Sequence, residues 1–110
     1  MKKYNYNKRK VCIVTTNRAD YGHLRNLILS INKNKNFILK LIVSGSHLSK
    51  QHGYSINEIL NDKLPITTRI SLDVKKDFNN DEIVQSLSKI LIKFDNAIKK
   101  IKPDIILILG

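Results

Sequence analysis

Residues 11–16 read VCIVTT, and this β-branched, mostly apolar run predicts a buried strand. Residues 37–43 (FILKLIV) and residues 105–109 (IILIL) have the same continuously apolar character. Strands that are covered on both faces read in this way, because neither side of the strand meets water. We therefore expect a sheet whose main strands are buried on both faces.

Two helical segments follow the first two strands. The first is marked by apolar residues at spacings of three and four, which form one face of a helix: Leu24, Leu27, Ile28 and Ile31. Residues 17–22 precede it as a turn, in which Asp20 is suited to cap the helix. Residues 55–61 predict a short second helix, with Ser55 and Glu58 three residues apart as a capping box.

The longest helix lies near the end of the chain. It follows a short, more polar strand around residues 66–72, which Pro65 precedes. Asn80 is its candidate cap, and Pro103 marks its end because proline cannot continue a helix. Its apolar stripe is long and regular: Ile83, Leu87, Ile90, Leu91, Phe94, Ile98 and Ile101.

The resulting order is β-α-β-α-β-α-β, which predicts an α/β fold with a parallel, Rossmann-like sheet. We divide the chain into a basic flexible arm over residues 1–10 and a partial Rossmann-like domain over residues 11–110. The chain stops one residue after its most hydrophobic strand, at the point where function gathers in open α/β sheets. We therefore expect a piece of a longer protein, whose last strand has an unpaired edge and an uncovered apolar face.

The chain has 110 residues and a formal net charge of +11, with 20 Lys and Arg against 9 Asp and Glu. Its hydrophobic content of 42% is too high for a disordered chain. Its one cysteine, Cys12, excludes a disulfide framework, and we expect it in the core. The longest aliphatic run, residues 105–109, is far shorter than the ~20 residues that span a bilayer. We therefore expect a cytoplasmic protein with no membrane partner.

The positive charge raises the question of a nucleic-acid partner. The first ten residues carry five basic side chains interleaved with Tyr4 and Tyr6, which is compatible with an arm that contacts phosphates. The sequence has no helix-turn-helix, zinc-finger or RNA-binding aromatic motif, so a solvated basic tail is the favoured interpretation. A basic nucleic-acid-binding module stays as an alternative function.

Two loops that follow strands hold the candidate binding residues. Arg18 lies at the approach to a helix N-terminus, where backbone N–H groups attract anions, and is either a phosphate ligand or a surface partner of Asp20. His47 is either a substrate or acid–base residue or an ordinary loop histidine. Tyr21 is expected to be a packing residue. No carboxylate pair is placed for catalysis and the histidine spacings fit no metal site, so we assign no catalytic residue and no metal.

Four segments in register resemble the start of the UDP-N-acetylglucosamine 2-epimerases: VTTNRADYG (residues 14–22), VSGSHLS (residues 43–49), HGY (residues 52–54) and KPD leading into LILG (residues 102–110). The T-x-R-A-D-Y-G form is similar to the hydrolysing branch, which feeds the synthesis of sialic acid and related nonulosonic acids. The resemblance runs in order across residues 11–110.

The resemblance implies a GT-B fold, in which two Rossmann-like domains bind the substrate between them. This chain would be the first part of the N-terminal domain. The implied reaction converts UDP-GlcNAc or a diacetamido analogue to the 2-epimer sugar and UDP. By position, Arg18 would contact the UDP phosphates, Gly22 would lie near the nucleotide, and His47 would line the sugar side or a regulatory pocket.

We expect no cofactor and no metal. The Asp-Arg pair that follows Leu109-Gly110 in the family, and the second domain that holds uridine, are not part of this sequence. We therefore expect the 110-residue chain to be inactive by itself. The resemblance is compatible with a homo-oligomer of the full-length enzyme, and the residues leave the oligomeric state open. A non-catalytic half-domain that needs a partner chain is the other alternative function. The residues leave open which UDP-sugar is used.

Overall fold

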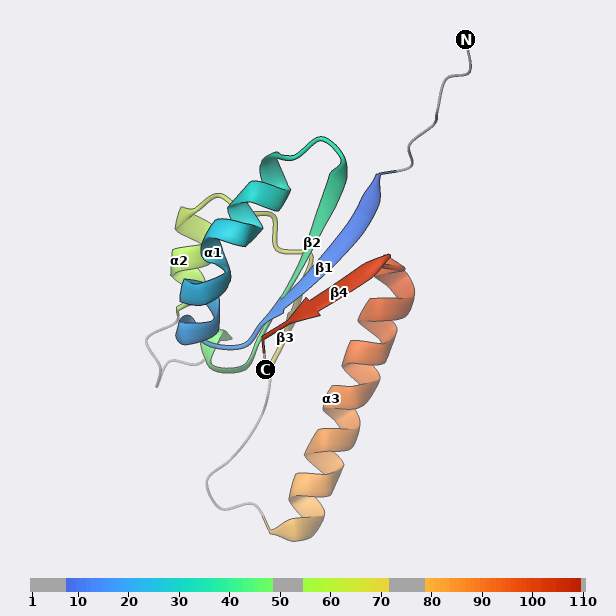
Figure 1. The fold of residues 1–110 in the computed structure, drawn as a ribbon. Coiled ribbons are helices and arrows are strands. Elements are labelled where there is room, and N and C mark those ends of the chain that lie inside the picture. Colours follow the sequence, from blue (N-terminus) through green and yellow to red (C-terminus); the bar gives the residue numbers. More distant parts are fainter. Residues whose placement is uncertain (1–7, 49–54, 72–78, 110) are drawn as a thin grey trace.

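The computed structural model describes residues 8–48, 55–71 and 79–109. Among these residues, parallel strands form one sheet in the order β3-β2-β1-β4: β1 (Arg9–Thr15), β2 (Phe37–Ser44), β3 (Thr68–Ile70) and β4 (Ile105–Ile108) (Figure 1). The helices are α1 (Arg18–Lys33), α2 (Ile56–Asn61) and α3 (Asn80–Ile101), and a 3-10 turn, η1 (Gly45–Leu48), follows β2. The predicted α/β fold with a Rossmann-like parallel sheet is therefore confirmed.

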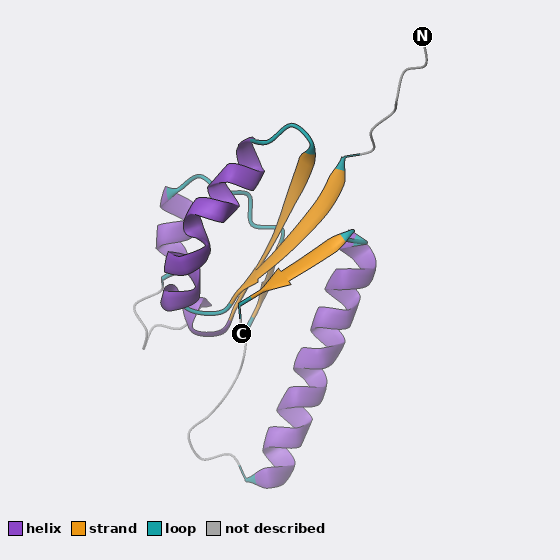
Figure 2. Cartoon of the chain, viewed as in Figure 1, coloured by secondary structure: helices purple, strands orange, loops and turns teal. Residues whose placement is uncertain are grey.

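Helices lie on both faces of the sheet. Figure 2 shows α1 and α2 on one face and α3 on the other. Side chains alternate between the two faces along a strand, so neighbouring residues of β1 enter different clusters. Val11 and Ile13 pack on the side of α1 and α2, whereas Cys12 packs with Ile42 on the side of α3.

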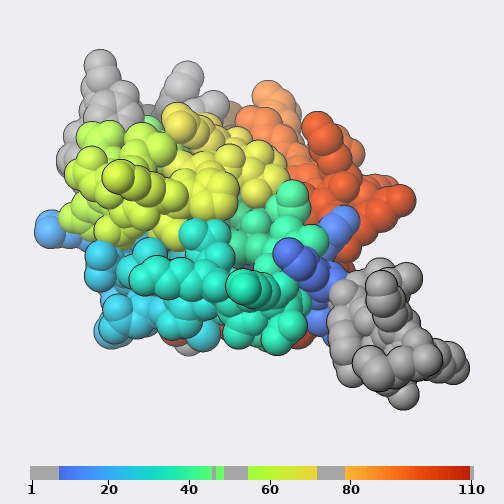
Figure 3. Space-filling view, turned by 90° about the horizontal axis from the view of Figure 1, so that it is seen from above, coloured from blue at the N-terminus to red at the C-terminus, as the bar shows by residue number. Residues whose placement is uncertain are grey.

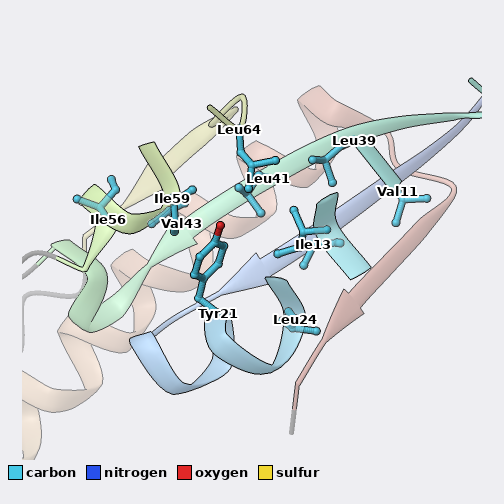
Figure 4. Close-up of a cluster of buried hydrophobic side chains, with 11 residues drawn as sticks. Val11, Ile13, Tyr21, Leu24, Leu39, Leu41, Val43, Ile56, Ile59 and Leu64 are labelled. Atoms are coloured by element: carbon cyan, nitrogen blue, oxygen red, sulfur yellow. The ribbon is translucent and has the colours of Figure 1, made fainter. Parts of the chain in front are cut away.

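Most of the core lies between the sheet and the pair α1 and α2. Its buried members are Val11, Ile13, Tyr21, Leu24, Ile28, Leu39, Leu41, Val43, Ile56, Ile59 and Leu64 (Figure 4). The cluster against α3 is smaller: Cys12, Ile42, Ile70, Ala97 and Ile101. The expected core position of Cys12 is confirmed, and burial raises the pKa of its thiol.

β4 and the first half of α3 are poorly covered in this chain. The expectation that residues 105–109 are buried on both faces is wrong, because β4 is the edge strand and Ile105, Ile106 and Ile108 are exposed, while Leu107 alone of this strand packs against the core. The uncovered apolar face expected for the last strand is found instead. The first turns of α3 extend past the sheet (Figure 1), and they expose Ile83, Val84, Leu87, Leu91 and Ile92. No helix in the described ranges combines the length and the apolar character needed to cross a bilayer.

β1 begins earlier than the sequence predicts. Arg9 and Lys10 pair with the start of β2, and the backbone N–H of Lys10 donates to Asp104 Oδ2 at 2.7 Å. The assignment of residues 1–10 to a flexible arm is therefore wrong for these two residues, because backbone pairing to a neighbouring strand outweighs their polar side chains. Residues 1–7 lie outside the described residues.

α1 also begins earlier, at Arg18, inside the stretch predicted as a turn. Its N-cap is Asn17, whose Oδ1 accepts from the backbone N–H of Asp20 at 2.8 Å. The prediction of Asp20 as the cap is wrong. Asparagine and aspartate are equally good caps, so composition does not tell which of the two occupies the non-helical position.

The other caps and the third strand differ in a similar way. Ser55 has helical backbone angles and makes no cap bond, because its hydroxyl is bonded to His47 instead. The cap of α3 is Asn79 rather than Asn80. β3 spans three residues within the predicted range 66–72, and just before it the backbone N–H of Thr67 also donates to the carbonyl oxygen of Leu41 in β2.

Candidate functional site

The carboxyl ends of β1 and β4 lie where the direction of strand order changes. From β1 the chain passes through α1 to β2 on one side, whereas β4 lies on the other side of β1 and follows α3 on the opposite face (Figure 1). Ligands of open α/β sheets bind outside the carboxyl ends of strands at such a switch point. Arg18 follows the end of β1, and His47 follows the end of β2. The structure therefore brings both predicted residues to this edge.

Arg18 is the first residue of α1, and its side chain is exposed. Its Nε lies 2.9 Å from Glu58 Oε1 of α2. The alternative partner considered from the sequence, Asp20, instead accepts a hydrogen bond from Thr16 Oγ1 at 2.7 Å. Exposed ion pairs contribute only ~0–1 kcal/mol to stability, so Arg18 can leave Glu58 at little cost to meet an anion.

The first turn of α1 also offers backbone donors. Asn17 accepts the N–H of Asp20 with its side chain and the N–H of Tyr21 with its carbonyl oxygen. Within the described ranges, the N–H groups of Arg18 and Ala19 have no protein acceptor. Such N–H groups, at the positive end of the helix dipole, suit an anionic ligand.

Gly45 holds the end of β2 against the end of β1. Its φ is +65°, in the left-handed region that favours glycine. A Cβ atom at this position would lie 2.4 Å from the carbonyl oxygen of Thr16, closer than two such atoms can approach. This close approach places the turn η1, and with it His47, directly beside the start of α1.

His47 is fully buried in the structure. Its Nε2 lies 2.9 Å from Thr15 Oγ1, and its Nδ1 lies 2.7 Å from Ser55 Oγ. Its ring meets that of Tyr21 edge-on, with 6.2 Å between the ring centroids. Burial lowers the pKa of His47, which favours the neutral imidazole. The ring therefore joins the end of β1 to the start of α2, while His52 lies outside the described residues.

A second cluster, formed by Tyr21, Arg25 and Asp62, joins α1 to the end of α2. Arg25 binds the carboxylate of Asp62 with two hydrogen bonds, from Nε at 2.8 Å and from Nη2 at 2.9 Å. The Tyr21 hydroxyl donates to the same carboxylate, while its ring is buried in the core (Figure 4). The expected packing role of Tyr21 is confirmed. The hydrogen bonds from Arg25 and Tyr21 lower the pKa of Asp62 to about 2.

The depressed pKa of Asp62 predicts an acid-dependent loss of stability. Its contribution is present above the unfolded value of 3.8 and is lost as the pH falls through about 2. We expect Asp62→Asn to cost about 1–3 kcal/mol at pH 7, because Tyr21 and Arg25 lose their ionised acceptor. The difference between the variant and the wild type should shrink between pH 4 and about 2, as measured by urea unfolding at each pH.

Asp95→Asn is the matched control, because Asp95 forms only an exposed ion pair with Lys99, four residues along α3. This change should cost no more than about 0.5 kcal/mol. If Asp62→Asn had a cost at pH 7 that stayed constant down to pH 2, the assigned ionisation would be wrong.

Gly22, the third predicted site residue, lies on α1 beside an open depression of about 300 Å³. Tyr21, Arg25, Glu58 and Asp62 also line this depression. A Cβ atom at Gly22 would have no heavy atom within 4 Å, so the space over this residue is open. Glu58 therefore lines the depression with Gly22 and pairs with Arg18, whereas His47 is fully buried.

Sequence reasoning missed most of the side chains that build this region. Arg25 was detectable in principle, because it lies four residues after Tyr21 and so on the same side of α1. Asp62 lies beyond the end of α2, and its approach depends on how α2 packs against α1. Thr15 and Ser55 carry no local pattern that marks them as partners of a buried histidine.

Known proteins resemble this chain over nearly its whole length. It is 36% identical over 103 residues to the Campylobacter jejuni GDP/UDP-N,N'-diacetylbacillosamine 2-epimerase (hydrolyzing), covering 94% of this chain and 26% of the relative. It is 29% identical over 102 residues to the Legionella pneumophila UDP-N,N'-diacetylbacillosamine 2-epimerase (hydrolyzing), covering 93% and 27%. The chain therefore spans about a quarter of the length of these relatives.

A solved structure of a UDP-GlcNAc 2-epimerase has a similar fold. The Neisseria meningitidis UDP-GlcNAc 2-epimerase, solved with UDP-GlcNAc bound, matches 92% of this chain and 26% of its own, with a TM-score of 0.63 and 19% identity. This likeness supports the predicted correspondence to the first part of a GT-B enzyme's N-terminal domain. The family model for UDP-N-acetylglucosamine 2-epimerase matches residues 29–110. Because the family model matches most of the chain and the matched residues form the parallel sheet, the chain belongs to the UDP-N-acetylglucosamine 2-epimerase family.

Proposed function

We propose that this chain is the N-terminal portion of a hydrolysing UDP-sugar 2-epimerase, and that it binds the diphosphate of UDP-GlcNAc or of a diacetamido analogue. The names of the Campylobacter and Legionella relatives, which are hydrolysing 2-epimerases of UDP-N,N'-diacetylbacillosamine, support the reaction type. The UDP-GlcNAc bound to the Neisseria structure supports the ligand class. The cleft between two domains, in which the family binds its substrate, would be formed by the complete protein and not by this chain alone.

The proposed reaction consumes water. A carboxylate removes the proton at C2, and the C1–O bond to UDP breaks, with its electron pair leaving on the UDP oxygen. Water then adds to the resulting glycal, with hydroxyl at C1 and a proton at C2 on the face opposite to the one that lost it. The products are the 2-epimer sugar and UDP.

The observation that carries the proposal is the position of Arg18 at the first turn of α1, at the switch point of the sheet. The N–H groups of Arg18 and Ala19 and the guanidinium group together offer several donors to one anion. The exposed pairing with Glu58 leaves the guanidinium accessible. These groups are suited to the diphosphate of a nucleotide sugar.

Gly22 and His47 have different roles in this proposal. The open space over Gly22, one turn after Arg18, leaves room for the nucleotide along α1. His47 is buried, so it fixes the turn η1 through Thr15 and Ser55 rather than facing the diphosphate site.

The carboxylates near this edge are engaged in contacts within the protein. Asp20 accepts from Thr16 and Asp62 binds Tyr21 and Arg25, whereas Glu58 pairs with Arg18 and so lies beside the proposed diphosphate site. We therefore assign ligand binding to this chain, with no catalytic residue, and assign proton abstraction at C2 to other parts of the complete enzyme.

The cellular setting is also part of the proposal. A role in nonulosonic acid synthesis, such as that of sialic acid, fits the hydrolysing relatives. A cytoplasmic location fits the single, buried thiol. We assign no metal, no cofactor and no nucleic-acid partner, and we expect a homo-oligomer of the complete enzyme.

Replacement of Arg18 tests the proposal in the complete enzyme that contains this chain. Arg18→Ala should weaken UDP binding about tenfold or more, because a charge-assisted, forked hydrogen-bond donor is lost. The UDP affinity of Arg18→Lys should lie between those of Arg18→Ala and the wild type, since lysine keeps the positive charge but not the forked donor geometry. Calorimetric titration with UDP measures the affinity of both variants. The rates of UDP release from UDP-GlcNAc and from UDP-N,N'-diacetylbacillosamine show which of the two sugars the enzyme prefers.

The control is Arg9→Ala, at the opposite end of β1. It should leave UDP affinity within about twofold, because long-range attraction between exposed charges is largely screened at physiological salt. Equal UDP affinity in Arg18→Ala and the wild type would refute the assigned role.

A further inference from the structure

A cavity of about 200 Å³ lies at the amino-terminal edge of the sheet, at the opposite end of the strands from the site above. Figure 3 looks onto this edge, where the start of β1 (blue), the residues before β3 (yellow) and the end of α3 (orange to red) come together. The cavity is lined by Lys10, Lys40, Thr67, Thr68, Lys100 and Ile101. This lining contains three lysines and no Asp or Glu.

The two lysines of the sheet point to the face that α3 covers. Lys10 and Lys40 each stand two residues before a member of the cluster under α3, Cys12 and Ile42, and side chains two apart share a face. Both lysines are half-buried. Lysine is rarely placed under a helix without a counter-charge, because a buried ammonium group loses its hydration.

Of the two half-buried lysines, Lys10 has a partner among the described residues that accounts for its position, whereas Lys100 is exposed in the last turn of α3. Lys10 Nζ donates to the carbonyl oxygen of Ile101 at 3.2 Å, at the negative end of the α3 dipole. The carboxylate of Asp104 accepts from the backbone N–H of Lys10 rather than from its ammonium group. Within residues 8–48, 55–71 and 79–109, Lys40 and Lys100 form no ion pair.

The geometry points to a binding site for a dianionic phosphate group in this cavity. Lys40 and Lys100 would balance its two charges, and an ammonium group offers three donors to a tetrahedral oxyanion. Thr67 Oγ1 already accepts from the backbone N–H of Leu41 at 3.2 Å, so its own hydroxyl hydrogen is left to donate. The cavity is smaller than the ~300 Å³ at which pockets for drug-sized ligands begin, so it suits inorganic phosphate or a small phosphorylated metabolite rather than a nucleotide sugar.

Titration of the full chain with inorganic phosphate, followed by ¹H–¹⁵N NMR at constant ionic strength, tests the site. We expect saturable shifts centred on the amides of Thr67 and Thr68. Lys40→Met and Lys100→Met should each weaken binding about tenfold, because each removes a charge-assisted hydrogen bond and keeps the aliphatic stem. Lys89→Met, on an exposed part of α3, is the matched control and should bind phosphate as the wild type does.

The other outcomes are equally informative. Chemical shifts that change linearly with phosphate concentration without saturating would show a diffuse cationic surface and overturn the proposal. Phosphate binding that weakens as much in Lys89→Met as in Lys40→Met would do the same. Binding of a single-stranded oligonucleotide that requires Lys40, without saturable phosphate binding, would replace it with a nucleic-acid surface. Tighter binding of glycerol 3-phosphate than of phosphate would identify a metabolite site. Lys100→Met, at an exposed helix end, keeps the test decisive if Lys40→Met does not fold.

This site is independent of the proposed UDP site. Arg18→Ala should leave the phosphate shifts at Thr67 and Thr68 unchanged, and Lys40→Met should leave UDP affinity unchanged. If Arg18→Ala abolished phosphate binding, or if Lys40→Met abolished UDP binding, the two measurements would report one site. That result would overturn the separate phosphate site.

Discussion

Gly45→Ala is expected to lower the free energy of unfolding by about 3 kcal/mol, from left-handed backbone strain together with a steric clash. The left-handed φ of +65° is unfavourable for alanine, and its Cβ would lie 2.4 Å from the carbonyl oxygen of Thr16. Neither strand can yield easily, because β1 and β2 pair along seven residues in the middle of the sheet. Urea unfolding followed by circular dichroism measures the loss.

Gly22→Ala is the matched control for this prediction. The Cβ would meet no heavy atom within 4 Å, and this glycine stands inside α1 without a positive φ. Alanine should therefore stabilise the protein by about 0.5–1 kcal/mol, because glycine loses more backbone freedom on folding. Equal and small changes at the two positions would show that the approach of Gly45 to Thr16 is not a tight constraint.

Self-association of the 110-residue chain is the second large effect that we expect. The edge strand β4 offers unpaired backbone groups, and Ile108 and Leu91 are each 68% exposed. Edges and contiguous apolar surfaces of this kind recruit further copies of a chain. The net charge of +11 opposes association, but its repulsion is screened beyond about 8 Å at physiological salt. Sedimentation velocity should show a mass that rises with both protein and salt concentration.

Lysine substitution on this surface should return the chain to a monomer. Ile108→Lys with Leu91→Lys adds charge to both the edge strand and the helix, and the mass should stay near 12.7 kDa over the same concentration range. Leu27→Lys with Leu60→Lys is the control, because these side chains are 43% and 44% exposed on α1 and α2. A wild-type chain that is monomeric at all concentrations would contradict the prediction.

The element order was predictable because it depends on local pattern. The apolar runs over residues 11–16, 37–43 and 105–109 each overlap a strand of the sheet, and the periodic residues of the long helix lie in α3. Boundaries were less predictable, since Asn17 and Asp20 are equivalent as caps by composition. The sequence motif also brought Arg18 to attention, but it did not show that Glu58 rather than Asp20 is its partner.

The side chains that assemble across elements were beyond sequence reasoning. His47 is buried between Thr15 and Ser55, although its loop reads as polar and exposed, because three elements meet around it. The pairing of Asp62 with Arg25, and the cavity formed by Lys10, Lys40 and Lys100, likewise join residues that are far apart in the chain.

The sequence by itself determined the alternation of strands and helices, the parallel sheet and the family, since hydrophobic periodicity and short motifs act over a few residues. Only the tertiary structure decided which faces are covered, where charges meet and which polar groups are buried. Those properties depend on the packing of helices against the sheet, which brings together side chains from elements tens of residues apart. The fully buried His47 and the exposed Ile108 show the difference, because the local sequence around each one predicts the opposite environment.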